Sequence, residues 1–269
     1  MITASDLDRT LMYSNRALKE FGIPENIELK QVEFHKGTWT GYMTVAAFSM
    51  LKEVSSHSLF IPVTTRTTEQ FKRFVIFEKE IPLTYAITTN GAHILYKGEP
   101  LKDWSEQLII QLKNGCAPEE ELLSALKKAG ITLDGDRKHA ENLFFYYILN
   151  CLPTPSELRE IRELTAQYGW KMSLQGRKLY FIPTAISKGK ALEFICNREG
   201  MEAMAGAGDS VLDWDFLKNC TYRFVPSHGE LLKVMGPADI TLTNQLGVAA
   251  GEEILDRFLH ALSLKANFS

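Results

Sequence analysis

The sequence lacks the features that mark membrane, exported and nucleic-acid-binding proteins. No apolar run approaches the ~20 residues that are needed to span a bilayer. The first residues, Met1 to Asp6, lack the basic and apolar regions of a signal peptide. The net charge of −3 indicates no basic surface for nucleic acid. We therefore expect a cytoplasmic protein that binds neither membranes nor nucleic acids.

Cysteine and histidine patterns that are typical of zinc sites are also missing. The four cysteines are widely and irregularly spaced, with no Cys-x-x-Cys pair, so a zinc site is not expected. Wide spacing in a chain of 269 residues favours reduced, mostly buried thiols. The cysteines are Cys116, Cys151, Cys196 and Cys220. The six histidines show no metal-ligand spacing, and we assign them no role.

Length and composition fit one large globular domain or two modest ones. The chain has 45% hydrophobic and 23% charged residues, which is ordinary for a globular protein. Short strand-like runs alternate with amphipathic segments, which predicts βαβ units and a mostly parallel sheet. The composition shifts near Asp103. We expect the stretch from Asp103 to about Pro183 to form a second α/β module, inserted between two halves of the first.

Hydrophobic periodicity and turn residues predict the individual elements. Single strands are expected over residues 1–5, 59–64, 85–89, 142–152, 201–207, 223–225 and 239–242, and hairpins over 28–43 and 170–182. Helices are expected over residues 15–21, 44–54, 67–79, 103–113, 118–129, 189–198, 211–217 and 252–264, with another that begins at Thr154. Pro62 argues against a central place for its strand, unless it lies at a strand start or a bulge.

Two carboxylates, Asp6 and Asp8, follow the first predicted strand. In open α/β sheets, ligands bind at the carboxyl ends of the strands. One carboxylate can attack a phosphorus atom while the other moves a proton, and either can help to hold a hard divalent cation. Asp-x-Asp is a common pattern, and a polar turn after an edge strand is the alternative interpretation. The functional interpretation therefore depends on three later segments.

Each later segment carries a side chain that suits phosphoryl chemistry. Thr64 ends a predicted buried strand and precedes Thr65 and Arg66, and its hydroxyl can donate to a phosphoryl oxygen. Lys188 stands at the mouth of a predicted helix, where its ammonium can neutralise both a phosphate and an attacking carboxylate. Gly208–Asp213 places two carboxylates at a strand-to-helix junction, which suits Mg²⁺. Taken singly, each segment also has a purely structural explanation.

Together and in this order, the four segments resemble the motifs of the haloacid dehalogenase-like hydrolase superfamily. Its motifs are Asp-x-Asp-x-Thr, a strand-end Thr or Ser, a Lys, and Gly-Asp-x-x-x-Asp. Here they are Asp6–Thr10, Thr64, Lys188 and Gly208–Asp213. The resemblance covers essentially the whole chain.

Asn90-Gly91-Ala92 is similar to the subgroup with a large α/β cap between the second and third motifs. That subgroup includes Cof-type, sucrose-phosphate and mannosylphosphoglycerate phosphatases. The resemblance implies an α/β, Rossmann-like core over residues 1–102 and 184–269, with a mainly parallel sheet and helices on both faces. It implies an inserted α+β cap over residues 103–183. Ser5–Leu11 also resembles the opening of bacterial members that are encoded beside tellurite-resistance genes.

The resemblance also implies a role for each motif residue. Asp6 would be the nucleophile that forms an aspartyl-phosphate, and Asp8 the general acid and then the general base. Thr64 and Lys188 would hold the transferring group. Magnesium would be bound by Asp6, Asp8 (through its backbone carbonyl), Asp209 and Asp213. Expected on the substrate side are Arg9, Thr10, Thr65, Arg66, Asn90 and Gly91.

The implied activity is that of a Mg²⁺-dependent phosphatase for a small phosphorylated metabolite, such as a sugar or polyol phosphate. A phosphomutase or phosphotransferase with the same intermediate stays open, as does a non-catalytic regulatory protein that binds a phosphometabolite. Arg9 is the main departure, because glycine is commonest at its position in the family. Its side chain could point toward the cap, contact the substrate or crowd it. The sequence does not define the oligomeric state.

Overall fold

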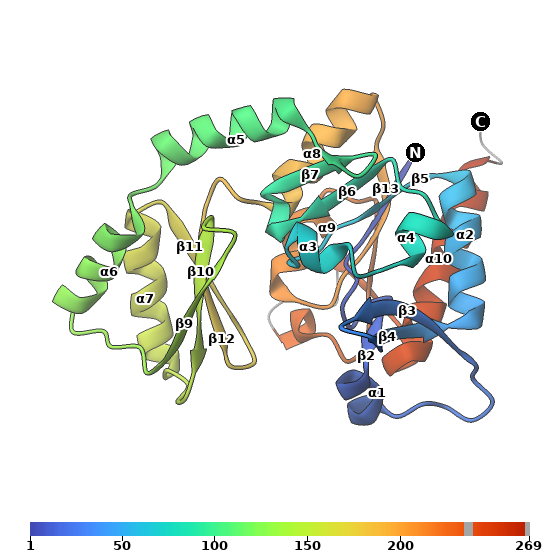
Figure 1. The fold of residues 1–269 in the computed structure, drawn as a ribbon, viewed down its shortest axis with the longest axis horizontal. Coiled ribbons are helices and arrows are strands. Elements are labelled where there is room, and N and C mark those ends of the chain that lie inside the picture. The colour runs from blue at the N-terminus through green and yellow to red at the C-terminus, as the bar shows by residue number, and fades with distance from the viewer. Residues whose placement is uncertain (234–238, 267–269) are drawn as a thin grey trace. The chain divides into compact units, whose positions relative to one another are not determined.

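The computed structural model describes residues 1–233 and 239–266 (Figure 1). The chain divides into two compact units. Unit 1 combines Met1–Leu101 with Lys188–Ser269, and unit 2 is Lys102–Ser187. The sequence places the ends of the inserted module at residues 103 and 183, close to these bounds. Within the described ranges, no helix has both the length and the apolar character of a membrane span.

Unit 1 is built on a parallel sheet of five strands, in the order β15, β14, β13, β1, β5. Each neighbouring pair is parallel. All residues of strands β13 and β1 are buried and most are small, as expected where both faces of a sheet are covered. The strands are β1 (Ile2–Ser5), β5 (Leu59–Pro62), β13 (Ala203–Ala207), β14 (Tyr222–Val225) and β15 (Thr241–Leu242). Pro62 ends the outermost strand, which agrees with the restriction inferred from the sequence.

Helices cover both faces of this sheet. In Figure 1, α2 (Val45–His57) and α10 (Gly247–Ala266) lie side by side to the right of the sheet, where they pack on each other. To the left lie α8 (Lys188–Glu199) and α9 (Trp214–Leu217). The helix α1 (Asn15–Phe21) packs against α10. The predicted α/β fold with a mainly parallel sheet is therefore confirmed.

An antiparallel hairpin follows α1. Strands β3 (Leu29–His35) and β4 (Thr38–Thr44) are joined by Lys36 and Gly37, which have φ values of 49° and 80°. The short strand β2 (Tyr13–Ser14) pairs with the other edge of β4. A Cβ atom on Gly41 of β4 would lie 2.7 Å from the Glu33 Cβ, so only glycine fits there without displacing Glu33.

The prediction of one continuous helix over residues 67–79 is wrong. The structure has two short helices, α3 (Thr68–Phe71) and α4 (Ile76–Lys79). Between them the backbone turns toward β3, because the Phe34 N–H donates to the Arg73 carbonyl at 2.9 Å. The hairpin thus binds a backbone carbonyl between the two helices. The helical pattern of the sequence does not reveal a hydrogen bond to a distant strand.

A second small sheet continues from β5. Strand β6 (Tyr85–Thr88) lies beside the residues after β5, since the Thr64 N–H donates to the Ile87 carbonyl at 2.9 Å. Strands β7 (His93–Tyr96) and β8 (Glu99–Pro100) then add to β6 in antiparallel order. They were not predicted, because each is short and follows its predecessor closely.

Unit 2 has an α+β composition. Its four-stranded antiparallel sheet has the order β11, β12, β10, β9. Phe145 and Phe181 stack in its core with ring centroids 4.9 Å apart. The strands are β9 (Gly135–Ala140), β10 (Phe144–Leu149), β11 (Trp170–Gln175) and β12 (Lys178–Pro183), and the helices are α5 (Lys102–Gly115), α6 (Glu119–Lys128) and α7 (Pro155–Gln167). Strand β9 is largely polar and exposed, so the sequence contained no signal for it.

All four cysteines are free thiols, but the expectation that most are buried is wrong. Only Cys220 is buried, Cys116 and Cys196 are half-buried, and Cys151 is exposed. Cys151 follows the end of β10, where the chain leaves the sheet at the surface. An apolar strand pattern in front of it gives no indication of where the strand ends.

Candidate active site

The nucleophile candidate, Asp6, directly follows β1. Its N–H donates to the Ala207 carbonyl at 2.8 Å, so the end of β13 fixes its backbone. Its carboxylate is buried and accepts from the Lys188 ammonium at 3.0 Å and from the Thr10 hydroxyl at 3.3 Å. Thr10 therefore orients Asp6, and the turn between the two residues closes back on the strand end.

The segment after β13 brings two more carboxylates to Asp6. Ser210 begins the short helix η2 (Val211–Asp213), and its N–H donates to Asp213 Oδ2 at 2.8 Å. A Cβ on Gly208 would collide with the Asp213 side chain, so glycine is required there. The helix predicted over residues 211–217 is divided at Asp213, where η2 gives way to α9.

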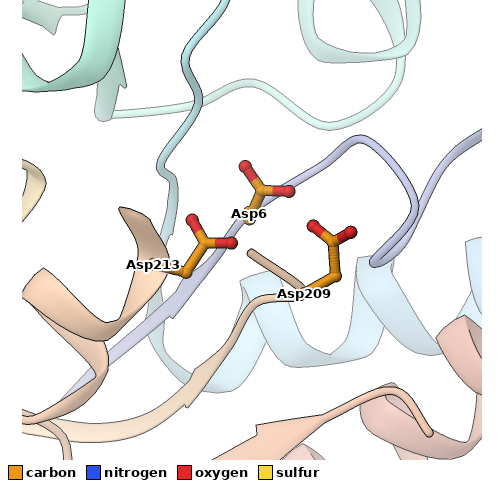
Figure 2. A group of neighbouring side chains, drawn as sticks. All are labelled: Asp6, Asp209 and Asp213. Atoms are coloured by element: carbon orange, nitrogen blue, oxygen red, sulfur yellow. The ribbon is translucent and has the colours of Figure 1, made fainter. Parts of the chain in front are cut away.

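Asp6, Asp209 and Asp213 form one group. Carboxylate oxygens from the three residues lie within 4.8 Å of one another, and all three side chains are buried. Figure 2 shows the three carboxyl groups gathered in one place, with Asp6 on the chain after β1 and the other two on the chain after β13. The carboxyl ends of two adjacent parallel strands thus create an oxygen-rich site.

Lys188, at the start of α8, is the cation of this site. It is about 1% exposed, and its ammonium donates to Asp6 at 3.0 Å and to Asp213 at 2.6 Å. Burial opposes its charge, but Asp213 and Asp6 outweigh burial and raise the pKa of Lys188 above its usual value. Three carboxylates outnumber this one buried ammonium, so the group has an excess of negative charge that only the Arg9 guanidinium, 3.8 Å from Asp209, offsets among the described residues.

Burial and the nearby negative charges both raise the pKa values of the Asp6 and Asp209 carboxyl groups. Burial and the Asp213 charge raise the pKa of Asp6 to about 7, against the opposing effect of Lys188. Burial and then the charges of Asp6 and Asp213 raise the pKa of Asp209 well above its usual value. A hard divalent cation prefers carboxylate oxygens and would supply the missing charge, so these residues fit Mg²⁺.

Asp8 lies outside this group of three carboxylates. Its side chain is 41% exposed and pairs with Arg66, whose Nε and Nη2 donate to its two oxygens at 2.6 Å each. Arg66 also donates to buried Glu33 of β3, with Nη1 to Oε1 at 2.5 Å. Its guanidinium lies over the Phe74 ring, 4.3 Å from the centroid. Glu33 was not found from the sequence, since nothing local links this strand residue to Arg66.

Thr64 and the turn after β6 form a further part of the site. The buried Thr64 hydroxyl accepts from the Arg66 N–H at 3.1 Å, and its carbonyl accepts from the Asn90 N–H at 3.0 Å. The turn η1 (Thr89–Gly91) has φ values of 50°, 58° and 96°. The buried Asn90 Oδ1 has no hydrogen-bond partner among the described residues. Thr65 is half-buried next to Thr64. Strained backbone and an orphaned polar atom suit a ligand-binding position.

The Arg9 side chain contacts residues of unit 1. Its φ is 63°, a conformation that favours glycine. Its guanidinium donates to both Glu20 oxygens, at 3.0 and 3.1 Å. Its Nε lies 3.8 Å from Asp209 Oδ2. Of the predicted site residues, the structure thus joins Asp6, Thr10, Lys188, Asp209 and Asp213 directly, with Arg9 at the Asp209 edge.

No family model matches the chain. The fold resembles sucrose-phosphatase from Synechocystis sp. PCC6803, solved with sucrose and phosphate, with a TM-score of 0.68 at 16% identity over 96% of this chain and 97% of that one. It also resembles yhjK, a haloacid dehalogenase-like hydrolase protein from Bacillus subtilis, with a TM-score of 0.57 at 14% identity over 96% of this chain and 91% of that one.

A sequence relative decides the family. The chain is 32% identical over 183 residues to phosphoglycolate phosphatase from Staphylothermus marinus, which covers 64% of this chain and 73% of that protein. The chain belongs to the haloacid dehalogenase-like hydrolase superfamily. It is a phosphatase of this superfamily, and the resemblance stated from its motifs is confirmed. The likeness of Ser5–Leu11 to members encoded beside tellurite-resistance genes has no counterpart in these relatives and stays a prediction.

The raised pKa of Asp6 predicts how the metal-free protein responds to pH. The pKa of Asp6 is higher in the folded than in the unfolded state, so between the two values the folded state binds more protons. The resulting destabilisation is absent below the unfolded value and complete above about 7. Thermal unfolding in EDTA should therefore show Tm falling from about pH 5 to about pH 8. Magnesium should raise Tm more at the higher pH.

Asp209→Asn is the matched variant for this measurement. It removes one of the crowded charges, so its Tm in EDTA should depend less on pH than the parent's. Its Tm should also respond less to magnesium. A parent Tm that magnesium leaves unchanged at both pH values would contradict the assignment of this group as a cation site.

Gly208→Ala tests the close approach that positions Asp213. The added methyl must displace the Asp213 side chain, so we expect a lower Tm and a roughly tenfold or greater loss of kcat/KM. Gly115→Ala is the control, because a Cβ there meets open space. Equal effects of the two substitutions, measured by thermal unfolding and phosphate release, would show that the crowding at Gly208 is unimportant.

Proposed function

We propose that the protein is a Mg²⁺-dependent phosphatase that hydrolyses a small phosphorylated metabolite, a sugar or polyol phosphate, through an aspartyl-phosphate on Asp6. One observation carries this proposal. The buried Lys188 ammonium joins Asp6 to Asp213 inside a group of three carboxylates that has an excess of negative charge. The sucrose and phosphate bound to the solved sucrose-phosphatase support a phosphorylated sugar as substrate.

In the first displacement, an Asp6 oxygen forms a bond to phosphorus while the bond from phosphorus to the leaving oxygen breaks. Lys188 keeps Asp6 oriented and offers positive charge to the phosphoryl oxygens. Thr64 accepts from Arg66 and keeps its own hydroxyl proton for donation to one of those oxygens. Magnesium, when held by Asp6, Asp209, Asp213 and the Asp8 carbonyl, supplies charge that stabilises both the phosphoryl group and ionised Asp6.

Asp8 completes both displacements by moving protons. It donates a proton to the leaving alkoxide, then accepts one from the water that attacks phosphorus and releases Asp6 and inorganic phosphate. Its two contacts with Arg66 fix where its carboxylate lies. Glu33 shares the same guanidinium, so the cation that orients Asp8 already has part of its charge balanced.

Substrate recognition is assigned to the polar groups around this centre. Asn90 has a buried amide oxygen that finds no partner within the described part of the chain and can accept from a substrate hydroxyl. We assign Gly91, Thr65 and Arg66 to the same side, with Thr10 orienting Asp6. Unit 2 is assigned the role of the cap that excludes bulk water from the reaction. A sugar or polyol offers the hydroxyl donors that Asn90 requires.

The first test is Asp6→Asn. Asparagine cannot form the acyl-phosphate, so Mg²⁺-dependent phosphate release from p-nitrophenyl phosphate should fall by about 10³-fold or more. The same variant removes a crowded buried charge and still accepts from Lys188, so its Tm in EDTA at about pH 8 should rise. Turnover equal to the parent's would overturn the nucleophile assignment. A panel of sugar, polyol and glycolate phosphates then ranks substrates by kcat/KM.

The same panel tests the phosphotransferase alternative. With an alcohol added as acceptor, a hydrolase still yields mainly inorganic phosphate, whereas a phosphotransferase yields mainly the new phosphate ester. We expect mainly inorganic phosphate, and a dominant ester product would favour the alternative.

Arg66→Lys tests the positioning of Asp8. Lysine keeps the charge but cannot make two bidentate pairs, so proton delivery to the leaving group should suffer. We expect kcat to fall by roughly 10- to 100-fold for a sugar phosphate. It should fall much less for p-nitrophenyl phosphate, because its phenolate leaves without a proton. Equal losses on both substrates would show that Arg66 has no special link to proton transfer.

A further inference from the structure

Arg9 is held firmly in a backbone conformation that favours glycine. Its N–H donates to the Met12 carbonyl at 2.8 Å, and its own carbonyl accepts from the Tyr13 hydroxyl at 3.1 Å. The same carbonyl accepts from His228 Nε2 at 2.8 Å, while His228 Nδ1 accepts from the Gly247 N–H at 3.3 Å. The position therefore tolerates a side chain because its surroundings fix the backbone.

The Arg9 side chain lies between two carboxylates. Both terminal nitrogens donate to Glu20 of α1, and the guanidinium lies over the Phe21 ring at 4.8 Å. Its remaining nitrogen, Nε, is 3.8 Å from Asp209 Oδ2, too long for a hydrogen bond but within ion-pair distance. Asp209 is buried and belongs to the proposed magnesium group, whereas Glu20 is exposed.

We propose that Arg9 and Glu20 set the affinity of the site for magnesium. This inference rests on the proposed function, in which Asp209 is a metal ligand. Arg9 places a positive charge beside Asp209, where it repels an incoming cation and competes for the same oxygen. Glu20 holds the guanidinium by its two terminal nitrogens, and so keeps it from moving fully onto Asp209.

This geometry argues against the simpler roles for Arg9. Each terminal nitrogen donates one of its two N–H groups to Glu20, so the guanidinium is held toward α1 rather than left free to follow a substrate. If the Arg9–Glu20 ion pair had a purely structural role, removal of either residue would harm the protein similarly, because both variants lack the same ion pair. If the pair controls metal affinity, the two substitutions should change the affinity for magnesium in opposite directions. Removal of Arg9 should tighten magnesium binding, and removal of the Glu20 charge should weaken it.

The experiment measures magnesium binding by isothermal titration calorimetry, with no substrate present. In Arg9→Gly the Kd for Mg²⁺ should fall by about threefold to tenfold, because a charge beside a ligand oxygen is removed while the backbone conformation is kept. In Glu20→Gln the Kd should rise by a similar factor. The double variant should match Arg9→Gly, since Glu20 acts only through Arg9. Arg9→Gln removes the charge with less change in packing and replaces Arg9→Gly if that variant does not fold.

Lys19→Gln is the matched control. It removes one positive charge from the same helix at an exposed position, and its Kd should equal the parent's. An Arg9→Gly protein that binds magnesium no more tightly than the parent would overturn the inference. The inference would also be overturned if Glu20→Gln changed the Kd for Mg²⁺ equally with and without Arg9, because Glu20 would then act through its own charge rather than through Arg9. If Asp209→Asn and the parent bind alike, or neither binds, the magnesium site of the proposed function is itself wrong.

Discussion

The ion pairs of Lys188 are the interactions on which this structure depends. A buried ammonium is costly unless carboxylates surround it, and carboxylates that are buried together require a cation or must take up protons. Lys188 meets both requirements by contacting Asp6 and Asp213 at once. It cannot neutralise three carboxylates, however. Burial, and then the charges of the neighbouring carboxylates, raise the pKa values of Asp6 and Asp209. The fold therefore carries an electrostatic cost at the candidate active site.

Parallel strands make this arrangement possible. Asp6 follows β1, and Asp209 follows its neighbour β13, so their side chains meet at one edge of the sheet. Small residues in β13 allow the neighbouring elements to approach closely. A Cβ on Gly206 would lie 2.6 Å from the Cys220 sulfur, and one on Gly208 would collide with Asp213. Glycines in and directly after β13 therefore allow both the close packing around this strand and the position of the Asp213 carboxylate.

Local sequence signals predicted those parts of the fold that depend on neighbours in the chain. The strand before Asp6, the helix after Lys188 and the capping box that begins at Thr154 all have such signals. The break between α3 and α4 does not, because it arises from a hydrogen bond between Phe34 and Arg73. Glu33 was missed for the same reason. Its importance comes from Arg66, a partner that only the folded hairpin brings within reach.

One short segment of the site reaches several different partners. From Asp6 to Thr10, successive polar side chains leave the backbone toward different partners. Asp6 contacts Lys188 and Asp8 contacts Arg66, while Thr10 turns back to Asp6. Arg9 alone reaches Glu20 and the edge of Asp209. The roles proposed for Asp6, Asp8 and Arg9, namely phosphoryl attack, proton transfer and control of the cation, would therefore fall on residues at most three positions apart. A substitution at position 9 changes the charge beside Asp209 and leaves the contacts of Asp6 with Lys188 and Thr10 in place. On the proposed roles, this position would adjust metal affinity separately from the reaction itself.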